Sequence, residues 1–251
     1  MCGRYTVTSP LDELLETFDV SEVVLGAWRP RYNVAPGQEA PALVAGKNGL
    51  RLGLLTWGGE GPSGRSRINV RSENLGRVPS YREAMKARRC LIPADGFYEW
   101  KADSTPADDF GPDLFSASGN GGTSPRGRPP RPRGRRTPYW FHRPDRGLFG
   151  LAGLWEPSTA EGSPPSFVIL TTEPNARVAQ VHDRMPVVLT PEEGRRWLDR
   201  GEDPKALREL LAPAAEDFLE AWPVAPAVGS SDFDDPSCVL PAGPPLVRPR
   251  G

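Results

Sequence analysis

The chain begins Met1-Cys2-Gly3-Arg4-Tyr5-Thr6-Val7-Thr8, and the rest of the fold is interpreted outward from this stretch. Residues 3–8 are rich in β-formers and predict a short strand, which would hold Cys2 at the end of a sheet. The alternative is that Cys2 is an incidental residue on a mobile terminus.

Cys2 is of chemical interest because removal of Met1 would place an α-amine and a thiol on one residue. Their ordinary pKa values are about 7.7–8.0 and about 8.5, so both are expected to be partly nucleophilic near neutral pH. Such a 1,2-aminothiol condenses with an aldehyde to an imine. The thiol then closes on the imine carbon to give a thiazolidine ring.

The composition is that of a soluble globular protein. Hydrophobic residues make up 37% and charged residues 25% of 251 positions, enough for one large domain or two small ones. The net charge of -1 gives no global basic signal, so nucleic-acid binding must come from a local patch. The sequence shows no signal peptide and no apolar run of membrane-spanning length. Its three cysteines argue against disulfides and predict a reducing, cytoplasmic setting.

Cysteine spacing and short motifs exclude several common functions. Cys2, Cys90 and Cys238 are odd in number and far apart, which argues against a disulfide framework and a zinc site. The sequence has no P-loop, GxGxxG fingerprint, CxxC pair or GxSxG elbow. The sequence therefore argues against the commonest classes of nucleotide-binding protein and serine hydrolase.

Periodicity and turn residues predict a mixture of strands and helices. Strands are expected at 3–8, 41–45, 50–57, 68–73, 90–93, 97–100, 139–142, 148–155, 167–170, 187–189 and, as a short edge, 239–240. Helices are expected to start near Ser9, Ser80, Thr190 and Asp203, with a short one ending near Val181. Ser80-Tyr81-Arg82-Glu83 has the pattern of a capping box, and Asn48-Gly49 that of a hairpin turn.

A segment of different character lies at about residues 102–136. It is rich in Ser, Gly, Pro, Asp and Arg and has few apolar residues, with acids in its first half and six arginines in its second. This composition predicts a disordered insertion between two strands of one domain. The arginines either contact nucleic-acid phosphates without sequence preference or belong to a solvated linker.

Three strand segments carry candidate site residues. Asn69, Arg71 and Glu73 alternate on one strand face, which is either functional or merely solvated. Glu99 stands among aromatic residues, where a carboxylate resists ionisation and can act as an acid. The simpler interpretation of Glu99 is an exposed residue on an edge strand. Trp57 ends a strand beside two glycines, as a core residue or a ligand platform.

Further candidates lie where a helix is predicted to meet a strand. His182 and Arg184 occupy this junction, a common place for site residues. The chain has two histidines, and His182 is the better candidate for a titrating catalytic group. His142, at a strand end, is interpreted as incidental.

Six segments in this order resemble the SOS response-associated peptidase (SRAP) family, which includes YedK-type and HMCES-type abasic-site proteins. The segments are Met1–Tyr5, Tyr32–Pro36, Asn69–Glu73, Arg89–Trp100, Ala152–Glu156 and His182–Pro186. The resemblance spans residues 2–242, interrupted by the insertion at about 102–136, and leaves 243–251 as a flexible tail. Around Val228-Gly229-Ser230 the sequence departs from the family, because Gly229 stands where an Asn is expected after the valine.

The resemblance implies a single α+β domain with a curved, mostly antiparallel, barrel-like β-core and flanking helices. It implies a monomer without cofactor or metal that loses Met1, binds single-stranded DNA and captures abasic sites covalently during the response to DNA damage. Only weak lyase activity is expected. The implied catalytic residues are Cys2, Asn69, Glu99 and His182, and the implied DNA-binding residues are Arg4, Arg71, Arg184 and Trp57.

These residues suit the chemistry of an abasic sugar, with Glu99 as the acid that opens the ring and His182 as a proton shuttle. Asn69 would hold the amine or a sugar hydroxyl. Two alternatives stay open. One is a cysteine peptidase using Cys2 and His182, which would not need the free amine. The other is a non-catalytic single-stranded DNA-binding module, which would bind intact and abasic strands equally.

Overall fold

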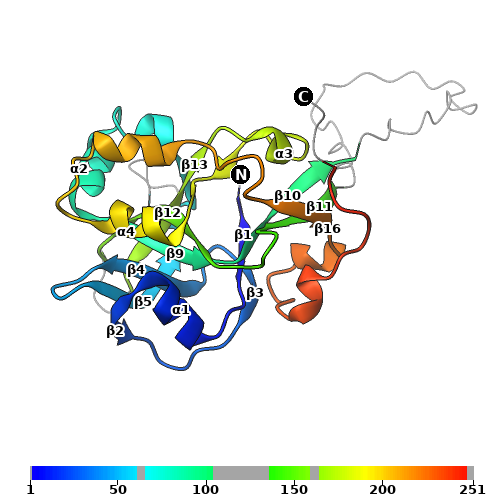
Figure 1. Ribbon diagram of the computed structural model, residues 1–251, viewed down its shortest axis with the longest axis horizontal. Coiled ribbons are helices and arrows are strands. Elements are labelled where there is room, and N and C mark those ends of the chain that lie inside the picture. Colours follow the sequence, from blue (N-terminus) through cyan, green and yellow to red (C-terminus); the bar gives the residue numbers. More distant parts are fainter. Residues whose placement is uncertain (1, 61–65, 104–135, 159–163, 248–251) are drawn as a thin grey trace, which may run out of the picture.

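The computed structural model describes residues 2–60, 66–103, 136–158 and 164–247 (Figure 1). Two main sheets share one apolar core, to which the first contributes Tyr5 and Phe97 and the second Leu43 and Phe149, all fully buried. The expected α+β fold, with a mostly antiparallel β-core and flanking helices, is confirmed.

The first sheet is entirely antiparallel and contains the N-terminal strand. Its order is β16 (Glu220–Pro223), β11 (Arg136–His142), β10 (Gly96–Ala102), β1 (Arg4–Val7) and β3 (Arg31–Val34). The predicted strand at 3–8 is thus β1. It pairs with β10 on one side and β3 on the other, so Cys2 lies just before the start of a central strand of this sheet.

The second sheet closes on itself. Its strands are β2 (Val20–Val24), β4 (Glu39–Ala45), β5 (Leu50–Trp57), β8 (Asn69–Arg71), β9 (Arg89–Ala94), β12 (Phe149–Glu156), β13 (Ser166–Thr172), β14 (Met185–Pro186) and β15 (Val188–Leu189). Strands β13, β12, β9, β4 and β5 follow one another, and a parallel pairing of β5 with β13 completes the ring. A short ribbon of β6 (Gly59–Glu60) and β7 (Ser66–Arg67) stands apart.

Helices lie on the outside of this ring and against the first sheet. The α-helices are α1 (Leu11–Phe18), α2 (Pro79–Ala87), α3 (Ala176–Ala179) and α4 (Pro191–Leu198), and the 3-10 helices are η1 (Ser72–Asn74), η2 (Ala206–Leu211), η3 (Pro226–Gly229) and η4 (Pro236–Val239). Helices α2 and α4 pack on β9 and β12, and α1 packs on α4, all outside the ring, whereas η3 and η4 contact strands β11 and β3 of the first sheet. No helix in the described ranges is both long and apolar enough to cross a membrane.

Two local sequence patterns, the hairpin turn at Asn48-Gly49 and the helix start at Thr190, agree with the structure. The hairpin between β4 and β5 turns at Gly46–Gly49, closed by the Gly46 N–H donating to the Gly49 carbonyl at 2.8 Å. Gly49 has φ +126°, and a Cβ there would begin 2.1 Å from Ser21 Oγ, so glycine is required. Helix α4 has the reciprocal capping box of Thr190 and Glu193.

Three expectations were wrong. Ser80 is not a cap, because α2 begins one residue earlier at Pro79, with Val78 at the N-cap and no side-chain bond. The strand expected at 68–73 stops at Arg71, and the chain then turns into η1. The edge strand expected at 239–240 is not formed, because Pro236 starts the 3-10 helix η4 there.

The insertion expected at about 102–136 falls largely outside the described residues. Its flanks are described: Ala102 pairs with Arg136 and Lys101 with Thr137, across the antiparallel β10 and β11. The insertion therefore connects two neighbouring strands of one sheet.

Candidate active site

The catalytic candidates come from four elements that converge at the start of β1. The β1–β10 register pairs Arg4 with Tyr98, so the residues before Arg4 run toward Glu99 on the next position of β10. Strand β13 carries β8 on one side and β14 on the other, which brings Asn69 and the loop containing His182 to the same region.

Cys2 is fully buried and held through its backbone. Asn69 Nδ2 donates to the Cys2 carbonyl at 2.7 Å, and the Cys2 thiol donates to the Arg4 carbonyl, with a sulfur–oxygen distance of 3.7 Å. Burial raises the pKa of the thiol far above its ordinary value, and the nearby Glu99 carboxylate raises it further. The expectation of a partly ionised thiol near neutral pH is therefore wrong for this folded state: the group is a neutral S–H.

Asn69 has an unused acceptor beside Cys2. Its Oδ1 is buried and has no hydrogen-bond partner within the described parts of the chain. Since a buried polar atom of this kind is costly unless it is satisfied, Oδ1 is suited to accept from an N–H or O–H group brought in at Cys2.

Glu99 is a buried acid, only 2% exposed, rather than an exposed edge residue. Burial raises its pKa from the ordinary 4.5 to about 7, because the charged form loses its hydration. A large fraction of Glu99 is therefore protonated at neutral pH and can donate a proton.

His182 faces Glu99 from the loop between α3 and β14. Its Nε2 lies 3.9 Å from Glu99 Oε2, and its Nδ1 accepts the Arg184 backbone N–H at 3.0 Å. The neutral ring therefore carries its proton on Nε2, toward Glu99. Burial lowers the pKa of His182, while Asp183, with Oδ1 2.9 Å from Nδ1, opposes that change.

The three arginines expected at the site are placed differently from one another. Arg71 is exposed on β8. Arg184 is only 9% exposed and forms a bidentate ion pair with Glu73, at 2.6 and 2.9 Å, while also donating to the Thr171 carbonyl at 2.7 Å. This pairing lowers the pKa of Glu73 to about 2.

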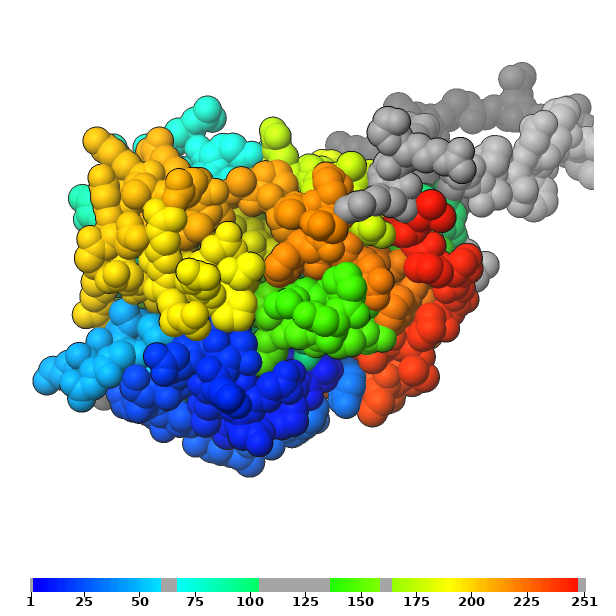
Figure 2. All heavy atoms as spheres, viewed as in Figure 1, coloured from blue at the N-terminus to red at the C-terminus, as the bar shows by residue number. Residues whose placement is uncertain are grey.

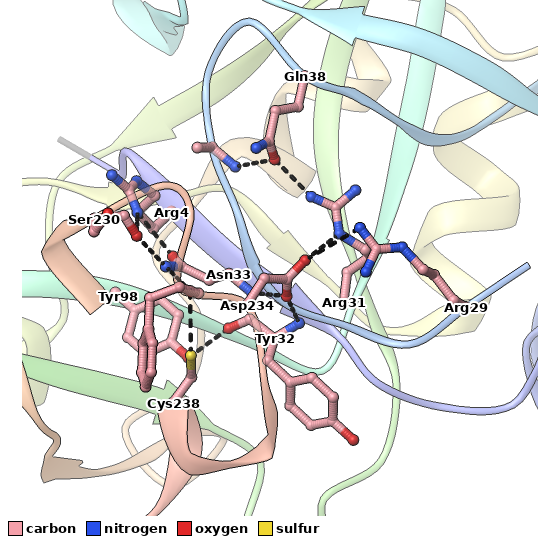
Figure 3. Close-up of polar contacts among 12 residues, drawn as sticks. Arg4, Arg29, Arg31, Tyr32, Asn33, Gln38, Tyr98, Ser230, Asp234 and Cys238 are labelled. Atoms are coloured by element: carbon pink, nitrogen blue, oxygen red, sulfur yellow. Dashed lines mark hydrogen bonds and ion pairs between the residues drawn. The ribbon is translucent and has the colours of Figure 1, made fainter. Parts of the chain in front are cut away.

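Arg4 reaches away from Cys2 into a network that ties the N-terminal strand to the C-terminal segment (Figure 3). It donates to Asn33 Oδ1 at 3.0 Å and to the carbonyls of Val228 at 2.8 Å, Gly229 at 2.8 Å and Ser230 at 3.2 Å. The backbone carbonyls of this turn satisfy Arg4 and Asn33, so packing there does not depend on a side chain at Gly229.

Asp234 completes the same network. Its carboxylate accepts the backbone N–H groups of Tyr32, at 2.6 Å, and Asn33, at 3.0 Å, and pairs with Arg31 at 2.5 Å (Figure 3). No sequence pattern indicated this role, because Asp234 lies 202 residues from its partner Tyr32 on β3.

The sequence model of the family described as SOS response associated peptidase (SRAP) matches residues 1–115 and 128–231. The chain belongs to the SRAP family.

Relatives of this SRAP chain include bacterial and vertebrate proteins. It is 34% identical over 249 residues to the abasic site processing protein YoqW of Bacillus subtilis (strain 168), covering 95% of this chain and 99% of that protein. It is 25% identical over 274 residues to the abasic site processing protein HMCES of Xenopus tropicalis, covering 95% and 78%. A solved structure from Bacteroides thetaiotaomicron has a TM-score of 0.71 at 19% identity, covering 96% and 100%.

Trp57 of this SRAP chain lies in the core. Its ring is fully buried, packs edge-on against Tyr5 at 5.3 Å and stacks on Phe167 at 6.1 Å between centroids, and its Nε1 donates to the Ile68 carbonyl at 3.0 Å. Because the ring is fully buried, it cannot stack on a base in this conformation. Its contact with Tyr5 instead packs the core against β1.

His142 is buried between Trp140 and Trp222, each 4.2 Å away between centroids, and burial lowers its pKa to about 4. Within the described residues, no group of three or more His, Cys, Asp or Glu side chains is arranged to hold a metal ion.

Proposed function

We propose that this protein forms a covalent crosslink to abasic sites in single-stranded DNA through Cys2, once Met1 has been removed. The observation that carries the proposal is the buried Glu99, with its pKa of about 7, beside Cys2 and facing His182. The names of the relatives YoqW and HMCES, both abasic site processing proteins, agree with it.

Ring opening is the first step. An abasic deoxyribose is mostly a closed hemiacetal, and its ring oxygen must gain a proton as the C1′–O bond breaks. Protonated Glu99 supplies that proton, and the C1′ hydroxyl releases one to solvent as the aldehyde forms. Solvent then returns a proton to Glu99, and His182 can relay it by first taking a proton from solvent and then giving one up from Nε2 toward Glu99.

Capture uses the amine and the thiol in sequence. The Cys2 amine attacks C1′, and loss of one water gives the imine. The neutral thiol then adds across the C=N bond, with sulfur bonding to C1′ and the thiol proton going to nitrogen. A buried S–H fits this addition, because the thiol brings the proton that the ring nitrogen requires. The free Oδ1 of Asn69 accepts from the amine or from a sugar hydroxyl during these steps.

DNA contacts are assigned to the arginines around the site. Arg71 is exposed and is proposed to bind phosphate directly. Arg4 and Arg184 use most of their N–H donors to bind groups of the protein. We therefore propose that Arg4 positions β1, that Arg184 positions the His182 loop, and that both attract phosphate through their positive charge. Trp57 is proposed to act only through the core under Cys2.

The family name, SOS response associated peptidase, suggests a peptidase as the second candidate function. A cysteine peptidase attacks with a thiolate, whose formation is favoured by a lowered pKa. The pKa of Cys2 is raised instead, which supports the amine-led reaction. β-Elimination, the lyase reaction of abasic sites, competes with ring closure and is expected to be weak.

The test uses purified protein and abasic single-stranded DNA. A denaturation-resistant adduct should form, and Cys2→Ala should abolish it. Protein whose α-amine is blocked but whose thiol is free should also form none, whereas peptidase activity would survive that treatment. No adduct from protein shown by intact mass to lack Met1 would overturn the proposal.

A further inference from the structure

A basic groove close to the candidate active site is lined by residues of the η1–α2 segment and of the segment that contains η2. The ribbons of these two segments are neighbours in Figure 1. Its volume is about 850 Å³. In Figure 2 the orange atoms of the η2 segment border the cyan atoms of the η1–α2 region at the upper left. We call it the α2–η2 groove; its basic lining residues are Arg77, Arg82, Lys86, Lys205 and Arg208.

The acidic residues of the groove are neutralised from outside it. Glu73 pairs with Arg184, and Glu209 pairs with Arg196. Neither Arg184 nor Arg196 lines the groove. The two acids therefore do not cancel the charge of the basic lining.

Most of the basic lining residues have no acidic partner. Lys86 pairs with the exposed Glu83 at 3.0 Å. Within the described ranges, the side chains of Arg77, Arg82, Lys205 and Arg208 have no ion pair or side-chain hydrogen bond, and all four are exposed. The groove thus presents several unpaired cations in a protein whose overall charge is near neutral, which marks a local polyanion surface.

The groove is continuous with the site through named contacts. Glu73 forms part of its wall and holds the Arg184 guanidinium, and the Arg184 backbone N–H holds His182 Nδ1. On the other side, β8 carries Asn69 and Arg71 and leads directly into η1, whose Ser72 also lines the groove. A chain leaving the site past Arg71 would enter the groove.

The lining indicates the chemistry of the ligand. The groove is lined by arginine and lysine side chains, and its described lining includes no aromatic ring on which a base could stack. Such a surface binds the sugar–phosphate backbone without reading bases. An acidic peptide would also be attracted, but only a DNA strand is already required at the adjoining site.

We propose that the α2–η2 groove binds the phosphodiester backbone of the DNA that flanks the abasic nucleotide, on the side that leaves the site past Arg71. The inference rests on the proposed function for the presence of DNA. It assigns a second, sequence-independent subsite that sets affinity and leaves the chemistry at Cys2 unchanged.

The test compares two charge-reversal doubles. Arg82→Glu with Arg208→Glu alters the groove, and Lys47→Glu with Arg195→Glu makes the same charge change at exposed positions that do not line it. Affinity for an abasic single strand of about 20 nucleotides should fall at least tenfold in the groove double only. The slope of log affinity against log salt should become shallower by about 1.4, for two lost single-strand phosphate contacts.

A short abasic strand of about 5 nucleotides, near the lower limit of single-strand site sizes, serves as the chemical control. It should crosslink equally well to the wild type and to both doubles. Strands made duplex on one side or the other of the lesion distinguish a single-stranded from a double-stranded occupant, and the sensitive side gives the polarity.

The outcomes are separable. If the groove double binds every long substrate with wild-type affinity and salt slope, the groove inference is overturned even though crosslinking occurs. If no protein crosslinks to any strand while the groove double alone loses affinity, the proposed reaction fails and the groove stands. Unfolding midpoints of the two doubles confirm that both are folded.

Discussion

At the scale of single residues, the site depends on groups whose surroundings oppose their ordinary charge states. Burial favours the protonated form of Glu99, whose pKa rises to about 7, and the same cause keeps Cys2 as a thiol. The identity of these residues could be predicted from the sequence, because an acid among aromatics and a second-position cysteine stand out. For Glu99 the aromatic neighbours allowed either a buried acid or an exposed carboxylate, and for Cys2 the neutral thiol was not predicted, because ionisation depends on how completely the fold removes water.

The pH dependence of crosslinking should report Glu99. The acid form is lost as pH rises through about 7, while the amine becomes nucleophilic as pH rises through about 7.7–8.0, so the rate should follow a bell with its maximum between these values. Glu99→Gln should lower the rate about 10²–10⁴-fold and remove the alkaline limb. Single-turnover rates from pH 5 to 9 test this, with Glu83→Gln, an exposed carboxylate, as control. An unchanged profile in Glu99→Gln would exclude it as the acid.

Glu99 should also leave a signature in stability. Its pKa is raised in the folded state, so between pH 4.5 and about 7 the folded protein holds a proton that the unfolded chain releases. The free energy of unfolding from this group therefore falls as pH rises through that window. Urea unfolding should show Glu99→Gln gaining on the wild type between pH 4.5 and 7.5; a parallel pair of curves would contradict the raised pKa.

Glu73 has the opposite sign. Arg184 lowers its pKa to about 2, so its stabilising effect is present above the ordinary 4.5 and is lost as pH falls toward 2. Glu73→Gln should be less stable than the wild type at pH 7, and the difference should shrink at pH 3. A difference independent of pH would mean that the ion pair does not carry the effect. Glu73 was noticed in the sequence for its strand face, but its partner lies 111 residues away and no local pattern indicates it.

At the scale of elements, the same sequence pattern had two outcomes. Both Ser80-Tyr81-Arg82-Glu83 and Thr190-Pro191-Glu192-Glu193 suggest helix starts with a cap. Only Thr190 forms the reciprocal bonds, with Glu193 N–H at 3.2 Å to its hydroxyl and its own N–H at 2.8 Å to Glu193 Oε2. In α2 the proline at residue 79 takes the first helical position and moves Ser80 inside the helix, where it cannot cap.

Matched alanine substitutions should separate these two helix starts. Thr190→Ala should reduce the free energy of unfolding by about 1 kcal/mol, since it removes one of the paired cap bonds. Ser80→Ala should change it by less than about 0.5 kcal/mol. Denaturant unfolding of both variants is the measurement, and an equal loss in the two would contradict the assignment of the caps.

At the scale of the whole molecule, the two ends of the described chain hold each other. Asp234 accepts N–H groups from β3 (Figure 3), and β3 pairs with β1, the strand that begins two residues after Cys2. The strands, the hairpin at Gly49 and the general α+β class follow from local sequence signals. The closed ring and this link between the ends depend on contacts between distant residues, so they required the structure or, for the fold class, the resemblance to a family.

Asp234→Ala should test that link. It leaves the Tyr32 and Asn33 N–H groups without their acceptor and Arg31 without its carboxylate, at an expected cost of about 2 kcal/mol in the free energy of unfolding. Asp232→Ala, at an exposed position in the same turn, is the control and should be near neutral. Equal stability of the two variants would show that the link contributes little.

The most direct test of the central claim is the mass of the denatured adduct between this protein and an abasic single strand. The account predicts a mass equal to the chain from Cys2 onward plus the DNA minus one water, stable without reduction, with the DNA on the peptide that begins at Cys2. An adduct on another residue, or one that still contains Met1, would contradict it.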